Sequence, residues 1–407
     1  MAADKQDKVL NVPTKGKFPN LRFPEFTDDW EQHPTTDYFE FKNGLNPDAK
    51  RFGSGTKFIS VMDILNNRYI TYDKIIASVK PKENDLKEFG VNYGDILFQR
   101  SSETLEDVGR ANVYLDKETA LFGGFVIRGK KIGEYNPLFF RYLLSCPHVR
   151  KRIVVKGAGA QHFNIGQDGL SKVALFVPSA KEQEQIANLL NLVDERIETQ
   201  IRIIEDLKSL SDVICERLYN PSGKGVWQTY KYADLFSISN ERNGKLQYKN
   251  VLSASQEYGM IERNELNIDI KFEESSITNY KIVRPNQYVI HLRSFQGGFA
   301  YSEKTGVCSP AYTILVPNEK LAMAFLKYYF TSKKFIDSLR IVTYGIRDGR
   351  SISVEEFLQL KVTIPDISQQ NHIVRVMQLW EEKIRTEEAY LSRLQCQKMY
   401  LLSSMFV

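Results

Sequence analysis

The second half of this 407-residue sequence repeats the first half, without a gap, at an offset of 187 residues. The repeat is clearest from Asn164 to Leu218, which aligns with Ser351 to Met405. A chain that repeats over this length is expected to fold as two modules of one architecture, each followed by the same kind of segment. The sequence therefore predicts two similar sites on one chain.

The last part of each repeat has the apolar spacing of a long helix. Apolar residues recur at alternating steps of four and three, and both copies turn polar at the same two positions. This spacing predicts coiled-coil helices with a shared register, each about 57 Å long. The predicted seam residues are Ile186, Leu190, Val193, Ile197, Ile204 and Leu207 in the first copy, and Ile373, Met377, Trp380, Ile384, Leu391 and Leu394 in the second.

The two predicted helices are expected to pair with each other. Because each helix follows its own module, a pseudo-twofold arrangement requires an antiparallel pair. The alternative is two unrelated amphipathic helices, each packed on its own module, but the matching seam positions favour pairing. We therefore predict an α+β fold in which two tandem α/β modules are separated by two long helices that form an antiparallel coiled coil.

Turn-forming residues and periodicity divide the chain into segments. In the first module, strands are predicted over 57–61, 95–98, 111–115, 122–128 and 173–177, and a helix over 137–152. The segments are an N-terminal tail (1–29), the first module (30–180), the first long helix (181–218), a linker (219–226), the second module (227–366) and the second long helix (367–407).

Composition excludes several classes of protein. Hydrophobic residues make up 42% of the chain, which is enough for packed cores. The sequence has no apolar run of about 18 residues and no signal-peptide core at its start, so we expect a cytoplasmic protein. The four cysteines form no CxxC pair, which favours reduced thiols over a zinc site. The net charge of +5 is a weak indication of a polyanionic partner.

Residue patterns typical of enzymes are missing from the sequence. It contains no phosphate-binding loop and no glycine-rich turn for a nucleotide cofactor, and its five histidines lack metal-ligand spacing. The acidic pairs Asp194-Glu195 and Glu381-Glu382 are interpreted as solvated charges on helix faces. We therefore predict a non-catalytic recognition protein without a metal site.

Basic and amide side chains in the first module favour nucleic-acid binding. The predicted helix and the residues after it carry a row of cations: Arg141, Arg150, Lys151, Arg152 and Lys156. A loop from Gly157 to Asn164 follows, in which glycines at 157 and 159 allow close approach of the backbone to a phosphate. Gln161 and Asn164 can pair with an adenine edge.

The matching loop of the second module has different chemistry. It runs from Tyr344 to Ser351 and carries Arg347 and Arg350, which suit guanine or phosphate. The alternative is an ordinary polar turn beside a solvated basic helix. Equivalent strands that end in Arg-Ser complete the predicted DNA contacts, which are Arg100, Ser101, Arg152, Lys156, Gly157, Gln161, Asn164, Arg293, Ser294, Tyr344, Arg347 and Arg350.

The sequence resembles the specificity subunits of type I restriction-modification systems over nearly its whole length. The resemblance rests on the segment 21–26 (LRFPEF) followed by Trp30, on the tandem arrangement, and on the paired segments 178–186 (PSAKEQEQI) and 365–373 (PDISQQNHI). The second of these departs from the pattern, because His372 stands where the first has Gln185.

The resemblance implies a function for each part of the chain. Each module would be a target recognition domain that reads one half of a split DNA site, and the coiled coil would fix the spacing between the halves. Such subunits recruit two methyltransferase subunits, which use S-adenosylmethionine to methylate adenine. They also recruit two translocating endonuclease subunits, which use ATP and Mg²⁺. A two-module coiled-coil scaffold that binds other proteins, or an enzyme with an unrecognised site, are the alternatives.

Overall fold

The computed structural model describes residues 18–159, 161–221, 226–255, 258–263, 274–291, 298–339, 343–344 and 351–407. The chain divides into two compact units, and the division falls within both long helices. Unit 1 comprises Met1–Ile201 with Tyr390–Val407, and unit 2 comprises Arg202–Ala389. Each unit therefore contains one module and parts of two long helices.

Both units contain a central sheet of four antiparallel strands with the same connectivity. The strand order is β2-β9-β5-β7 in unit 1 and β13-β20-β17-β18 in unit 2, so the repeat extends from the sequence to the topology. The strands are β2 (Phe39–Asn43), β5 (Ile96–Gln99), β7 (Ala111–Val113), β9 (Val126–Lys131), β13 (Phe236–Ser239), β17 (Tyr288–Ile290), β18 (Phe299–Tyr301) and β20 (Thr313–Pro317).

A second strand pair joins the start of each module to its end. β1 (Glu31–Pro34) pairs antiparallel with β11 (Ala174–Val177), and β12 (Gln228–Lys231) pairs in the same way with β23 (Lys361–Ile364). The second strand of each pair, β11 or β23, directly precedes a long helix in the sequence. The first strand of a module and its last strand are therefore fixed together where that helix begins.

Short elements complete the two modules. The remaining strands are β3 (Phe52–Ile59), β4 (Ser78–Val79), β6 (Ser101–Ser102), β8 (Leu121–Phe122) and β10 (Phe163–Asn164) in unit 1, and β14 (Leu252–Ser255), β15 (Gly259–Glu262), β16 (Lys281–Val283), β19 (Gly306–Cys308), β21 (Thr343–Tyr344) and β22 (Ser351–Ile352) in unit 2. The short helices are α1 (Val61–Asn66), α2 (Asp85–Phe89), α3 (Pro137–Ser145), α4 (Pro147–Val154) and α5 (Gln167–Ser171) in unit 1, and α7 (Phe325–Tyr329), α8 (Lys333–Ser338) and α9 (Val354–Gln359) in unit 2.

The helix predicted over 137–152 is in fact two helices, α3 and α4, which meet at Cys146. Cys146 has an extended backbone (φ −67°, ψ 149°) because the ring of Pro147 disfavours a helical conformation in the residue before it. The break lets α4 turn its own apolar residues, Val149 and Ile153, into the core of unit 1. The single helix predicted from the apolar pattern was wrong at this proline.

The long helices are α6 (Ala180–Leu218) and α10 (Ile367–Ser404). In unit 1 their segments run antiparallel: Asp194 pairs with Lys398 at 2.6 Å, and Arg196 lies over the ring of Tyr390. Of the predicted seam residues, Ile186, Leu190, Ile204, Ile373, Met377 and Leu394 are buried, and Val193, Ile197, Leu207, Trp380, Ile384 and Leu391 are partly buried.

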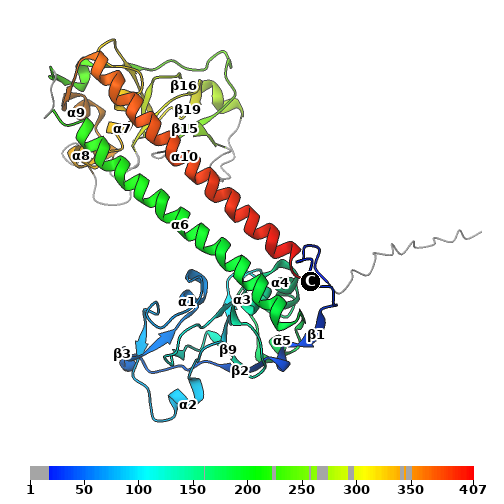
Figure 1. Ribbon diagram of the computed structural model, residues 1–407. Coiled ribbons are helices and arrows are strands. Elements are labelled where there is room, and N and C mark those ends of the chain that lie inside the picture. The colour runs from blue at the N-terminus through cyan, green and yellow to red at the C-terminus, as the bar shows by residue number, and fades with distance from the viewer. Residues whose placement is uncertain are drawn as a thin grey trace, which may run out of the picture. The chain divides into compact units, whose positions relative to one another are not determined.

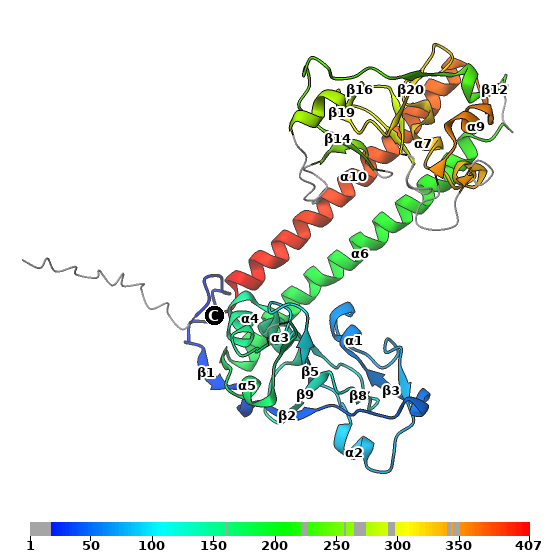
Figure 2. The same cartoon turned by 180° about the vertical axis from the view of Figure 1, so that it is seen from behind.

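The core of each unit contains the end of the helix that follows the other module. In unit 1, Trp30 packs edge-on against Phe139 of α3 and against Phe406, which follows α10. The last turn of α10 lies beside α4 (Figures 1 and 2), where the His148 ring contacts the Ser403 carbonyl at 3.1 Å. In unit 2, residues at the end of α6 join a core of aromatic side chains.

A buried glutamine holds the first turn of each long helix to its own module. Gln183 and Gln370 occupy equivalent positions in the repeat and are 4% and 1% exposed. Each donates its side-chain N–H to the carbonyl of the proline five residues earlier. Each also accepts a backbone N–H from the module, that of Asn136 at 3.0 Å or that of Ala322 at 2.8 Å. The glutamines thus satisfy backbone groups that burial would otherwise leave unpaired.

In unit 1 a buried ion pair also attaches the N-terminal segment to the first turn of α6. Glu182 is 1% exposed, and its two carboxylate oxygens accept hydrogen bonds from Arg22 at 2.7 and 2.8 Å. The indole N–H of Trp30 donates to the same carboxylate at 3.3 Å. The hydrogen bond to Glu182 is the main cause of the raised pKa of Arg22. The segment 21–26 is therefore anchored through a two-bond guanidinium–carboxylate contact.

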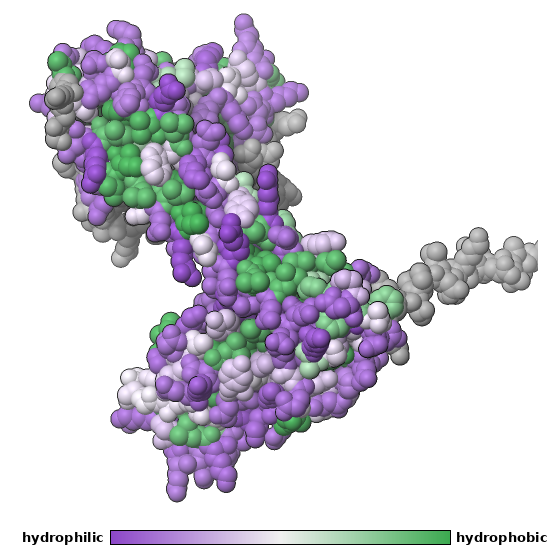
Figure 3. Space-filling model, in the orientation of Figure 1, coloured by the Kyte–Doolittle hydropathy of each residue, from purple (hydrophilic) through white to green (hydrophobic). Residues whose placement is uncertain are grey.

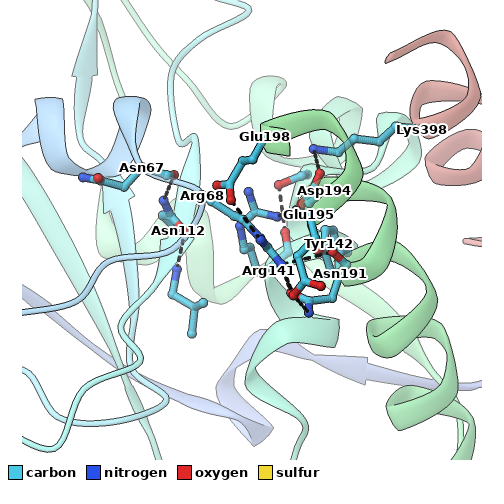
Figure 4. Close-up of polar contacts among 12 residues, drawn as sticks. Asn67, Arg68, Asn112, Arg141, Tyr142, Asn191, Asp194, Glu195, Glu198 and Lys398 are labelled. Atoms are coloured by element: carbon cyan, nitrogen blue, oxygen red, sulfur yellow. Dashed lines mark hydrogen bonds and ion pairs between the residues drawn. The ribbon is translucent and has the colours of Figure 1, made fainter. Parts of the chain in front are cut away.

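The sequence predicts solvated charges at Asp194 and Glu381, but Asp194 is buried, and Glu381 is partly buried and paired. Asp194 is 5% exposed and accepts a hydrogen bond from the Tyr142 hydroxyl at 2.9 Å (Figure 4). It also pairs with Arg141 at 3.3 Å and with Lys398. A carboxylate can be buried here because cations and a hydroxyl replace the water that it loses.

Glu381 makes the equivalent contacts in unit 2. It accepts a hydrogen bond from the Tyr328 hydroxyl at 2.7 Å and pairs with Lys327 at 2.9 Å. Burial alone raises the pKa of Glu381, but these two contacts outweigh it and the pKa is lowered. Each long helix is thus joined to its own module by an acid that contacts a tyrosine and a cation.

We predict that Arg22→Ala lowers the free energy of unfolding by about 3 kcal/mol, because it leaves the Glu182 carboxylate buried without its cation. Urea unfolding of the full chain measures this loss. Lys172→Ala is the matched control, because its pair with Asp168 is exposed and is expected to contribute less than about 1 kcal/mol. Equal losses in the two variants would contradict a structural role for the buried pair.

Candidate nucleic-acid interface

The predicted loop of the first module lies against the end of the central strand β5. β10 pairs antiparallel with β6, which follows β5 directly after Arg100. Asn164 is opposite Ser101 in this pairing, and the Ser101 hydroxyl donates a hydrogen bond to the side-chain oxygen of Asn164. The structure therefore brings Asn164 beside Arg100 and Ser101, which precede it by more than sixty residues in the sequence.

The loop closes on itself. Ala158 and Asn164 exchange two backbone hydrogen bonds of 2.9 Å. Gly159 has φ +144°, and a Cβ atom there would lie 2.0 Å from the His162 carbonyl oxygen. A Cβ atom on Gly157 would lie 2.8 Å from a side-chain carbon of Val108. Both glycines thus have a role inside the module, beside the close approach to phosphate that the sequence suggested.

The side chains that the loop presents at the surface are polar and basic. Lys156, Gln161 and Asn164 are exposed. Arg100 is partly buried and donates a hydrogen bond to the Gly124 carbonyl at 3.3 Å. An exposed amide can pair with a base edge, and an exposed ammonium can contact a phosphate.

The arginines of the predicted basic row are engaged inside unit 1. Arg150 donates to two backbone carbonyls of the loop before β7 at 2.7 and 2.8 Å, and burial lowers its pKa to about 10. Arg152, a predicted DNA contact, is partly buried and donates to the Ala174 carbonyl at 3.2 Å. Arg141 pairs with Asp194. Lysines, including Lys151 of α4, provide the exposed charge of this row.

In unit 2 the equivalent loop is also bounded by paired strands. β21 and β22 are antiparallel, with Tyr344 opposite Ser351. Lys333 and Lys334 are exposed on α8, which corresponds to α4 of unit 1. The other predicted contacts of this module lie outside the described residues: Arg293, Ser294, Arg347 and Arg350.

Arg68 connects the first module to α6, and no sequence pattern predicted this role. Its guanidinium donates to the Asn191 carbonyl at 3.0 Å and pairs with Glu195 and Glu198, each at 3.3 Å (Figure 4). Asn112 on β7 fixes the preceding residues through a hydrogen bond to the Asn67 carbonyl at 2.8 Å. The segment that includes α1 is therefore held between the sheet and the helix.

The described part of the chain offers neither a metal site nor a membrane-spanning helix. Among these residues, no group of three or more His, Cys, Asp or Glu side chains is placed to hold a metal ion. No described helix is both long enough and apolar enough to span a membrane.

Cys146 is a buried free thiol, and burial raises its pKa to about 11, which makes it unreactive.

Comparison with known proteins assigns both modules to one family. Residues 27–209 and 225–395 each match the sequence model described as the type I restriction modification DNA specificity domain. A curated relative, the putative type I restriction enzyme MjaX specificity subunit of Methanocaldococcus jannaschii, is 25% identical over 242 residues. That match covers 57% of this chain and 55% of the relative, so it spans about half of the relative's length.

Two solved structures share the fold. The S subunit of a type I restriction-modification system from M. genitalium has a TM-score of 0.53 and 16% identity, with 96% of this chain and 99% of that chain covered. A second structure, described as the structural basis of complex assembly and conformational transition of the type I R-M system, has a TM-score of 0.59 and 11% identity. It covers 92% of this chain and 96% of that chain.

We predict that Lys156→Ala and Gln161→Ala weaken DNA binding in different ways. Loss of a phosphate contact at Lys156 should weaken all sequences alike and reduce the salt slope by about one unit. Loss of a base contact at Gln161 should cost about 1–3 kcal/mol and relax specificity at one position. Filter binding over a salt series measures both effects. Unchanged affinity and specificity in both variants would remove this loop from the interface.

Proposed function

Because the chain belongs to the type I restriction modification DNA specificity family, we propose that it reads a two-part DNA site with one half-site for each module. The observation that carries this proposal is the repeat, since the two family matches fall on two modules with the same strand order. The loops differ in chemistry: the first carries the amides Gln161 and Asn164, and the second carries Arg347 and Arg350. Such a difference suits two half-sites of different sequence.

We propose that the chain acts within a larger complex on duplex DNA. Its partners would be two methyltransferase subunits and two endonuclease subunits that translocate DNA. The names of its relatives support this proposal, because one is a restriction enzyme specificity subunit and a structural neighbour concerns assembly of the type I system. The repeat supports two copies of each partner, because two equivalent modules offer two equivalent places for identical subunits.

Under this proposal, the partner subunits carry out the catalysis and this chain carries out the recognition. The methyltransferase partner would bind S-adenosylmethionine and transfer its methyl group to adenine, and the endonuclease partner would use ATP and Mg²⁺. The described residues of this chain would supply recognition alone: exposed amides for base edges and exposed lysines for phosphates.

We predict that replacing residues 227–362 with the equivalent module of a related specificity subunit changes one half of the methylated sequence and leaves the other unchanged. The reason is that each module has its own sheet and its own loop. Mapping methylated adenines in DNA from cells that express the complete system measures the outcome. The reciprocal exchange of the first module is the control and should change the opposite half. A change in both halves from either exchange would show that the modules do not read independently.

A further inference from the structure

A hollow of about 430 Å³ lies in unit 1 beside the candidate interface. Its wall includes Ser101, which contacts Asn164 of the loop, and the turn Gly123–Val126 between β8 and β9. Among the described residues that line the hollow, none is charged, and the polar ones are Asn46, Ser60 and Ser101. The hollow is therefore suited to an apolar group rather than to a phosphate.

Large apolar side chains surround this hollow. Phe125 and Met62 line it and are 70% and 60% exposed. Phe52 packs edge-on against Phe58 in the same lining, with 5.4 Å between the ring centroids. Figure 3 shows that apolar patches interrupt the polar surface of unit 1. A cluster of exposed apolar side chains around one hollow is typical of a binding site.

The two exposed side chains are carried on well-held backbone. The Phe125 carbonyl accepts a hydrogen bond from the Arg100 N–H at 2.9 Å. A Cβ atom on Gly124 would lie 2.0 Å from the Asn46 side-chain oxygen, so this turn packs closely against Asn46. Met62 lies in the first turn of α1, where the side chains of Ser60 and Asp63 form a capping box. The backbone that carries these two side chains is therefore held in place before a ligand arrives.

We propose that this hollow receives the C5-methyl group of a thymine in the half-site that the first module reads, an inference that rests on the proposed DNA-reading function. The thymine methyl is the apolar group that base pairs present in the major groove, and apolar side chains such as phenylalanine contact it. Ser101 belongs both to the hollow and to the Asn164 contact. A base whose methyl group enters the hollow would thus lie near Asn164.

Replacing thymine with deoxyuridine tests this assignment, because it removes the methyl group and nothing else. The probe is a duplex oligonucleotide that carries the methylated site, with each thymine replaced in turn. It is titrated with the full-length chain in complex with its methyltransferase partner. At one position of one half-site, we expect the replacement to weaken binding about fourfold, the effect of burying one methyl group.

Two variants test whether the methyl-sensitive thymine position contacts the hollow. Phe125→Ala and Met62→Ala should weaken binding to the thymine duplex and abolish the difference between thymine and deoxyuridine at the same position. Ile132→Ala is the matched control, because Ile132 is also in unit 1, is 56% exposed and does not line the hollow. It should retain both the affinity and the difference.

The outcomes separate this inference from the proposed function. Specific binding without a methyl-sensitive position, or with one that Phe125→Ala leaves unchanged, overturns the inference and leaves the DNA-reading function intact. Loss of the methyltransferase from the complex in Phe125→Ala, with the thymine difference retained, would instead make the hollow a protein-docking site. Failure of the unmodified complex to bind any site-containing duplex overturns both.

Discussion

The rest of the structure depends on one packing constraint: the core of each unit is closed by the end of the helix that follows the other module. Met405 and Phe406 are buried in unit 1, although they follow the second module in sequence. Cys215 and Tyr219 are buried in unit 2 at the end of α6. Neither half of the repeat therefore completes its core with its own residues alone. The contribution is large, because burying one large apolar side chain stabilises the fold by about 2–3 kcal/mol. Each core is therefore built from residues of both halves of the repeat.

Polar contacts then specify how each helix meets its own module. Gln183 and Gln370 satisfy backbone groups at the helix starts. About three turns further along, Asp194 and Glu381 each accept a hydrogen bond from a tyrosine and pair with a cation. Buried ionic contacts of this kind contribute little net stability, but they exclude alternative registers because a shifted helix would leave charges unpaired. The candidate recognition loops can then differ between the modules, while the contacts between each module and its long helix remain alike.

The sequence predicted the scaffold well and the candidate site less well, for a physical reason. Helix periodicity and the offset of 187 are local patterns, so they predicted α6 and α10. Whether a charged side chain is buried depends on distant partners. Arg150 and Asp194 were therefore interpreted as surface charges, although both are engaged inside unit 1. The hollow near Phe125 also had no signal, because its walls come from segments far apart in the sequence.

Hydrogen exchange of a variant at the C-terminal end tests the packing constraint most directly. Leu402 and Phe406 are 4% and 2% exposed in the core of unit 1. In the full chain carrying Leu402→Ala and Phe406→Ala, amides of β5 and α3 should exchange faster, because they share that core. The amides of unit 2 should exchange at their original rates, although the second module directly precedes the substituted helix in sequence. Faster exchange confined to unit 2 would contradict the account.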